Sequence, residues 1–110
     1  MDRDLETIDV GLRKGRIIIE WKTIRIKPEK RGLYLEKDAE IWTPALSREE
    51  GFLGKEVWLG EDEIVLVIRW RGRREWKGGP GERLEGLERR FREEVPDGWE
   101  MAGTRVYEVA

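Results

Sequence analysis

Two apolar segments dominate the pattern of hydrophobic and polar positions along the chain. The first, Ile64–Trp70, begins with an unbroken run of aliphatic residues. The second, Ile17–Ile26, carries apolar residues at both odd and even positions. β-Branched residues favour strands, and a strand that is apolar on both sides is usually covered on both sides. The pattern therefore predicts two central strands of a sheet.

Helical periodicity is found in two other segments. The first begins at Pro28, a residue suited to the first helical turn. Its apolar stripe has helical spacing and consists of Leu35, Ala39, Trp42 and Leu46. Pro44 lacks a backbone donor, so this helix should kink or loosen near its end. A second helix is predicted over residues 82–95, with the stripe Leu84, Leu87, Phe91 and Val95.

Two further strands and a short helix complete the predicted fold. Residues 52–59 alternate, which places Phe52, Gly54, Glu56 and Trp58 on one face. A hairpin loop joins them to Ile64–Trp70, a short helix follows at 73–77, and a last strand over 99–109 bends near Gly103. The order β-α-β-β-α-β is typical of the ferredoxin-like fold. We therefore predict the α+β class, with a four-stranded antiparallel sheet and helices on one face.

The second face of this sheet has no predicted cover. Both central strands are apolar on both sides, yet two helices can cover only one side of the sheet. The simplest cover is the same face of a second copy of the chain. We expect a homodimer through the sheet face, that is, a dimeric α/β barrel.

The chain of 110 residues is long enough for one domain. Residues 1–16 are polar and are expected to form a partly ordered N-terminal extension, and the folded domain is expected to span 17–110. A short edge strand over residues 7–12 is the alternative for the extension.

Composition excludes several kinds of chemistry. There is no Cys and no His, so thiol chemistry and the commonest metal and haem ligands are absent. We expect no metal and no cofactor. The net charge of −2 gives no field that would attract nucleic acid or an anionic membrane. No apolar run could span a bilayer and no signal peptide is evident, so we expect a cytoplasmic protein.

Charged residues make up 42% of the chain, and Asn and Gln are missing. Abundant Glu, Lys and Arg with few thermolabile residues is typical of proteins from hot environments. We therefore predict a thermophile protein, which a melting temperature in the mesophile range would contradict.

Three segments of the chain carry a family resemblance: residues 38–46, residues 51–58, and residues 65–70 with Trp76 and Lys77. They resemble a small uncharacterised family of cyanobacterial proteins, which is similar to the antibiotic-biosynthesis monooxygenase (ABM) group of dimeric α/β barrels. The resemblance covers residues 17–109. It implies a ferredoxin-like monomer, a dimer whose sheets face each other, and a pocket between each sheet and its helices.

The resemblance also implies an activity class. The superfamily includes cofactor-free oxygenases, haem degraders and proteins without known activity. Haem degraders use an Asn on the first strand, a Trp three residues beyond the aromatic of the short helix, and a His. The matching positions here fall near Trp21 and at Gly79, and the chain has no His. The resemblance therefore does not extend to haem degradation.

Candidate site residues fall into two groups. Tyr34, Trp42, Trp58, Trp70 and Trp76 are the candidate walls of a pocket for a small hydrophobic or planar ligand. Core packing is the simpler explanation of each tryptophan, and a residue can serve both purposes. Asp38 and Glu56 are candidate general bases, and Arg69 is a candidate partner for a substrate oxygen. The alternatives for the acids are a structural ion pair with Arg69 or Lys55, or simple exposure at a helix edge.

Two further motifs are weaker. Arginines interleaved with Trp70 and Trp76 resemble a patch for single-stranded nucleic acid, but the negative net charge argues against such a partner. The Gly78–Gly81 segment lacks the Lys-Ser/Thr pair of a phosphate loop and is better explained as a connection.

The function predicted from the sequence is a cofactor-independent, oxygenase-like enzyme for a small aromatic or hydrophobic substrate. The alternatives are a non-catalytic small-ligand-binding barrel and a purely structural dimer. An open space between sheet and helices would favour the first two, and a filled core the third.

Overall fold

The computed structural model describes residues 16–77 and 82–110, and the predicted extension lies outside this range except for Arg16. The strands are β1 (Ile18–Ile26), β2 (Phe52–Leu59), β3 (Glu63–Trp70) and β4 (Trp99–Glu108). The helical segments are η1 (Pro28–Lys30), α2 (Arg31–Lys37), η2 (Asp38–Trp42), α3 (Thr43–Ser47), α4 (Arg73–Lys77) and α5 (Glu82–Glu94). Their order confirms the predicted β-α-β-β-α-β arrangement.

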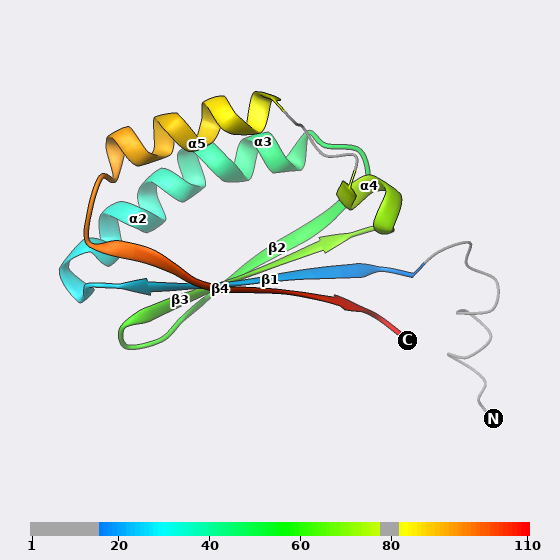
Figure 1. Ribbon diagram of the computed structural model, residues 1–110, viewed down its shortest axis with the longest axis horizontal. Coiled ribbons are helices and arrows are strands. Elements are labelled where there is room, and N and C mark those ends of the chain that lie inside the picture. Colours follow the sequence, from blue (N-terminus) through cyan, green and yellow to red (C-terminus); the bar gives the residue numbers. More distant parts are fainter. Residues whose placement is uncertain (1–15, 78–81) are drawn as a thin grey trace.

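All four strands pair in one antiparallel sheet of order β2-β3-β1-β4. The two segments predicted to be central, β1 and β3, occupy the middle of the sheet. Figure 1 shows α2, α3 and α5 on one side of the sheet, with α4 at the end where β3 stops. This is the ferredoxin-like fold, and the helices within the described residues lie on one face of the sheet.

The register of the central pair decides which side chains meet the helices. Ile18 lies opposite Trp70, and Ile24 lies opposite Ile64. All four side chains are buried. The alternate residues of β1, such as Trp21, point to the other side, which we call the outer face. Alternation along β1 therefore separates a helix-covered face from an open one.

The core between helices and sheet is divided into two clusters. The larger surrounds Ile24, Tyr34, Leu66 and Phe91 and includes Val95. The smaller contains Ile18, Ile68 and Trp70. Between them, on the same face of β1, the sequence places Glu20 and Lys22 rather than apolar residues. Charged side chains cannot close-pack as isoleucine does, so the core is interrupted at this point.

The first helical segment is a single helix in the prediction but four short pieces in the structure. The backbone N–H of Thr43 donates to the carbonyl of Asp38, which closes the wide π turn η2. Pro44 follows directly, and it lacks the N–H that would continue an α-helical ladder. The predicted loosening near Pro44 is thus confirmed, and it takes the form of a π turn.

Two irregularities in the edge strands were not foreseen in detail. Pairing of β2 with β3 shifts between Phe52 and Gly54, so Phe52 packs with Trp70 on the helix side. The predicted grouping of Phe52 with Glu56 and Trp58 on one face is therefore wrong. Pairing of β4 with β1 shifts opposite Thr23 and Ile24, close to the predicted bend.

The turn before β4 depends on a glycine. Gly98 has φ of +88°, a conformation that other residues adopt only with strain. Its carbonyl accepts a hydrogen bond from the backbone of Lys27. The turn therefore fixes where β4 begins and where Trp99, its first residue, is placed.

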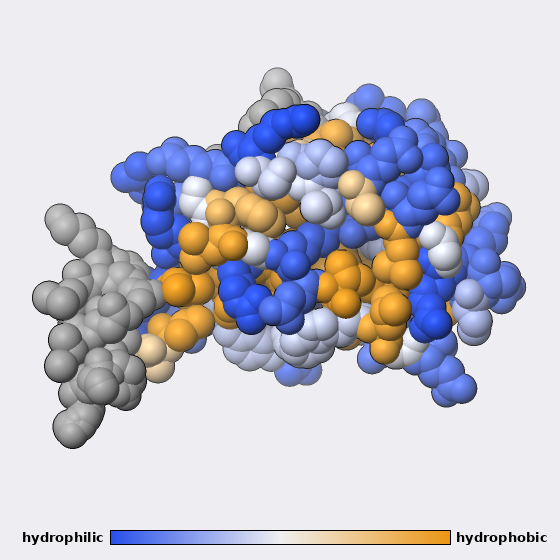
Figure 2. Space-filling model, turned by 180° about the vertical axis from the view of Figure 1, so that it is seen from behind, coloured by the Kyte–Doolittle hydropathy of each residue, from blue (hydrophilic) through white to orange (hydrophobic). Residues whose placement is uncertain are grey.

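Figure 2 shows hydrophobic patches separated by hydrophilic side chains on the face seen from behind. No helix within the described residues is long and apolar enough to cross a membrane.

Candidate functional site

A cavity of about 440 Å³ lies where the core is interrupted, between the helix layer and the sheet. Its volume is within the range of small-molecule sites. Six aromatic side chains contribute to its walls: Tyr34, Trp42, Trp70, Trp76, Phe91 and Trp99. The region between helices and sheet therefore contains an open pocket, as predicted, and is not a completely filled core.

The helix layer contributes residues at a regular spacing. Tyr34, Asp38, Trp42 and Leu46 all line the cavity, and each follows the previous one by four residues. Residues four apart share a helix face. Because the π turn contains both Asp38 and Trp42, the local distortion and the site coincide, as is frequent for π turns.

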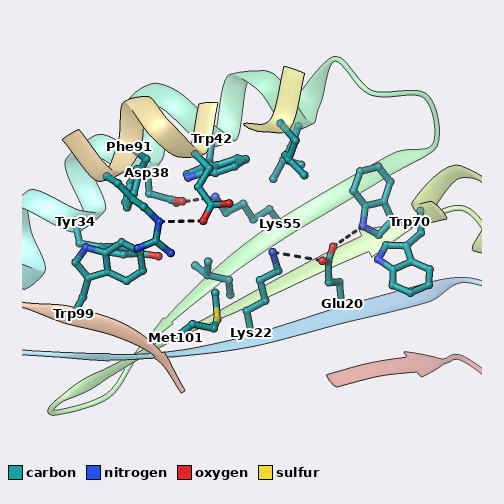
Figure 3. Close-up of a pocket in the computed structure, with 16 residues that line it drawn as sticks. Glu20, Lys22, Tyr34, Asp38, Trp42, Lys55, Trp70, Phe91, Trp99 and Met101 are labelled. Atoms are coloured by element: carbon teal, nitrogen blue, oxygen red, sulfur yellow. Dashed lines mark hydrogen bonds and ion pairs between the residues drawn. The ribbon is translucent and has the colours of Figure 1, made fainter. Parts of the chain in front are cut away.

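Asp38 forms a buried ion pair with Lys55 of β2. The distance from Lys55 Nζ to Asp38 Oδ2 is 2.6 Å, and the two side chains are 5% and 4% exposed. Lys55 Nζ also donates to Thr43 Oγ1 at 3.0 Å. Figure 3 shows Asp38 reaching down from the helix layer and Lys55 reaching up from the sheet.

The second carboxylate oxygen of Asp38 has no such partner. Oδ1 is buried and makes no hydrogen bond within the described chain. A carboxylate is an acceptor only, and a buried acceptor without a donor lowers stability by roughly 1–3 kcal/mol. The cavity beside it offers the place from which a ligand could supply that donor.

The hydroxyl of Tyr34 remains protonated near neutral pH. Burial raises the pKa of Tyr34, and the negative charge of Asp38 raises it further, whereas Arg92 acts in the opposite direction. Tyr34 packs edge-to-face against Phe91 and Trp99. It therefore supplies an aromatic wall and a neutral hydroxyl in the same part of the cavity.

Two charged groups on β1 line the sheet side of the cavity. Glu20 accepts a hydrogen bond from Trp70 Nε1 at 3.1 Å and lies 3.5 Å from Lys22 Nζ. These contacts, visible in Figure 3, fix the indole of Trp70 with its ring edge toward Glu20.

The opening of the cavity is bordered by α5. Arg92 pairs with Glu88 at 3.0 Å, and its guanidinium lies over the ring of Trp99 at 5.0 Å from the centroid. Trp99 Nε1 donates to the carbonyl of Val95 at 2.7 Å. Arg92 thus covers an aromatic wall while keeping its charge paired.

Comparison with solved structures identifies the fold. One match is a monooxygenase of Streptomyces coelicolor in complex with nanaomycin D, with 11% identity and a TM-score of 0.68 over 86% of this chain and 88% of that one. Another is SnoaB of Streptomyces nogalater, a cofactor-independent oxygenase, with 8% identity and a TM-score of 0.66 over 87% and 95%. A third is a proposed antibiotic biosynthesis monooxygenase of Nitrosomonas europaea, with 16% identity and a TM-score of 0.66 over 87% and 92%.

The chain has the fold of these oxygenases. At such identities the similarity shows the fold and not the activity. No protein-family model matches the sequence, and no curated protein is similar to it.

Five of the residues predicted from the sequence to form a site meet in the cavity. They are Tyr34, Asp38, Trp42, Trp70 and Trp76. Their placement is compatible with the predicted roles, which stay predictions until a ligand is tested.

The other three predicted site residues, Glu56, Trp58 and Arg69, are not in the cavity, and placing them there was wrong. Glu56 and Trp58 pair opposite Val67 and Val65 on the outer face of the sheet. Arg69 Nη1 lies 3.0 Å from Glu56 Oε2, which is the ion pair offered as the alternative. The pKa of Glu56 is lowered, first by its hydrogen bond from Trp58 and then by Arg69. Glu56 is thus a paired surface carboxylate.

Several cavity residues were not identified from the sequence as part of the site. Among them are Glu20, Lys22, Phe91, Arg92, Trp99 and Met101. The signal for the first two was present, since they are charged positions on the inward side of an otherwise apolar strand. Within the described residues no cluster of three acidic groups could hold a metal ion.

Proposed function

We propose that the protein is an ABM-like, cofactor-independent oxygenase that acts on a small aromatic substrate in the cavity. One observation carries the proposal: a buried carboxylate, Asp38, has one oxygen without a partner in a space with aromatic walls. The fold shared with a cofactor-independent oxygenase supports the reaction class.

The chemistry assigned to the site begins with a proton. A substrate hydroxyl donates its hydrogen bond, and then its proton, to Oδ1 of Asp38, acting as general base. The resulting phenolate is electron-rich and is oxidised by dioxygen. A ring carbon bearing two hydrogens becomes a carbonyl, and the second oxygen atom leaves as water. The aromatic walls hold the ring system and exclude bulk water from the anion.

Replacing Asp38 tests this role. In oxygen-uptake assays with hydroxylated anthrones, which carry such a ring carbon, Asp38→Asn should lower turnover by about 100-fold or more, because general-base catalysis typically contributes about 10²–10⁴. Unchanged turnover in a folded Asp38→Asn variant would remove Asp38 from the mechanism.

Two variants control for folding and for a general loss of charge. Asp38→Asn leaves Lys55 buried without its partner, so Asp38→Asn/Lys55→Met, which removes both charges, should lose turnover equally. Glu100→Gln removes a carboxylate from an exposed pair with Arg25 and should retain full turnover. Circular dichroism establishes that each variant is folded.

A non-catalytic binding protein is the second candidate. The ion pair of Asp38 with Lys55 favours it, because a carboxylate neutralised in this way has a structural explanation. Saturable binding of the same compounds without any oxygen uptake would select this candidate.

We also propose that the protein is a homodimer through the outer face of its sheet. Trp21 packs edge-to-face with Trp58 at 5.1 Å and with Tyr107 at 6.4 Å between ring centroids. Trp58 and Tyr107 are each 45% exposed. Aromatic residues gathered on an open sheet face are typical of an interface core.

A further inference from the structure

The charged residues of the cavity occur in pairs of opposite sign. Six charged side chains in the described chain line the cavity, three acidic and three basic. Each acid has one of these bases as its partner. The pairs are Glu20 with Lys22 at 3.5 Å, Asp38 with Lys55 at 2.6 Å, and Glu88 with Arg92 at 3.0 Å.

The pairs extend from the interior to the opening. Asp38 and Lys55 are 4% and 5% exposed, Glu20 and Lys22 are 16% and 32% exposed, and Glu88 and Arg92 are 52% and 58% exposed. Among the described residues, a charged ligand would therefore meet no unpaired opposite charge at any depth. On entering the cavity, a charged ligand would lose its hydration and gain no ion-pair partner in return. This is strongly unfavourable in a low-dielectric site.

A buried carboxylate oxygen in the cavity still lacks a partner among the described residues. Asp38 Oδ1 is buried and accepts no hydrogen bond from the described residues. Because the charge of Asp38 is already balanced by Lys55, this oxygen requires a hydrogen-bond donor rather than a positive charge. A hydroxyl or N–H group on a neutral ligand meets that requirement.

We infer that the cavity selects uncharged aromatic ligands that carry a hydroxyl or N–H donor, and that the three ion pairs exclude ligands of either charge. This specificity rests on the proposed ligand-binding role of the cavity. It does not depend on whether the bound ligand is then oxidised.

Calorimetric titration of the wild-type protein with four naphthalene derivatives at neutral pH tests the inference. The compounds are 2-naphthol, 2-methoxynaphthalene, 2-naphthoate and 2-naphthylmethylammonium. They share one ring system and differ in hydrogen-bonding capacity and charge. We expect 2-naphthol to bind most tightly and the methoxy compound about tenfold more weakly, as expected for one lost hydrogen bond to a charged group. Both ions should bind about tenfold more weakly again, or not at all.

Variants that neutralise one or both members of the Asp38–Lys55 pair test whether this ion pair sets the charge preference of the cavity. Lys55→Met leaves Asp38 unpaired and should strengthen binding of the ammonium compound by about tenfold or more. Asp38→Asn leaves Lys55 unpaired and should strengthen binding of 2-naphthoate by about tenfold or more. The double variant removes both charges and should return the preference to neutral compounds. Glu100→Gln, which alters an exposed pair with Arg25 outside the cavity, should keep the wild-type order.

The outcomes separate the two proposals. If either ion bound the wild-type protein as tightly as 2-naphthol, the inferred specificity would be overturned. Binding of none of the four compounds would overturn both the specificity and the proposed ligand site. The predicted order of affinities without oxygen uptake from any hydroxylated aromatic would support the specificity and overturn only the oxygenase. The wild-type series decides the question even if a single variant fails to fold.

Discussion

Asp38 joins the helix layer to the sheet through its contact with Lys55, and its surroundings restrict what it can do. Transfer of each charged group into the interior is unfavourable by several kcal/mol. An ion pair that is 4% and 5% exposed therefore contributes little net stability, and apolar residues of similar size would serve the core as well. The unpartnered Oδ1 adds a further penalty. A ligand-binding role explains both features.

Removing one member of this pair should be much more harmful than removing both. We expect Lys55→Met to lower the free energy of unfolding by about 3–5 kcal/mol, because it leaves the buried carboxylate of Asp38 without its ion. Asp38→Asn/Lys55→Met should be clearly more stable than Lys55→Met. Urea denaturation followed by circular dichroism measures both, and a loss below about 1 kcal/mol in the single variant would show that Asp38 is not buried as a charged group.

Among the elements, α5 packs beside α2 and η2 above the cavity, and ion pairs stabilise this contact between the helices. Lys37 lies 3.0 Å from Glu94 and 3.3 Å from Glu40, and Arg90 lies 3.0 Å from each of the same two acids. The four side chains form a closed network that joins α5 to α2 and η2 within the helix layer. Networks of this kind are more effective than isolated surface pairs.

This network predicts a dependence of stability on pH. The pKa of Glu94 is lowered, first by its hydrogen bond with Lys37 and then by that with Arg90. The contribution of the Glu94 carboxylate to folding stability is therefore fully present above the pKa that Glu94 has in the unfolded chain. This contribution is lost as the pH falls through the lower pKa of Glu94 in the folded protein. Melting temperatures of the wild type and Glu94→Gln should differ at pH 7 and converge below about pH 4. A difference that stays constant over this range would exclude the network as its source.

Local pattern was sufficient to predict the elements but not the orientation of their faces. Strand β1 was predicted to begin at Ile17 and begins at Ile18, because β-branched runs and turn residues act locally. Alternation in β2 puts Lys55 and Glu56 on opposite faces, but it does not say which face the helices cover. The usual expectation that the aromatic Trp58 points inward and Lys55 outward is reversed here. The assignment of Glu56, Trp58 and Arg69 to the pocket placed their sides of β2 and β3 inward, whereas the register places them on the outer face.

The local sequence pattern could not identify Trp99 and Phe91 as cavity residues, for a different reason. Trp99 and Phe91 come from the last strand and the last helix and meet Tyr34 only through the topology. Each alone is indistinguishable from an ordinary core aromatic. Only the gap left by Glu20 and Lys22 turns these aromatics into the walls of a cavity.

At the scale of the whole molecule, the outer face of the sheet differs from an ordinary solvated sheet surface. Val65 and Val67 on this face are 9% and 2% exposed. Aromatic rings flank them on the neighbouring strands, and Trp58 is half exposed. Antiparallel sheets that face water on one side normally alternate with polar residues there. The apolar character of this face is what a second copy of the chain would cover.

The dimer is tested by placing a charge on this face, at Trp58 of the edge strand β2. Light scattering coupled to size exclusion should give twice the 13.0 kDa chain mass for the wild type. Trp58→Glu should give the monomer mass at micromolar concentration, because an unpaired charge buried in an interface is strongly unfavourable. The matched control is Leu59→Glu, since Leu59 is the next residue of β2, is 56% exposed and points to the opposite face. Dissociation by both variants would locate the interface elsewhere, and a wild-type monomer at all concentrations would exclude the barrel.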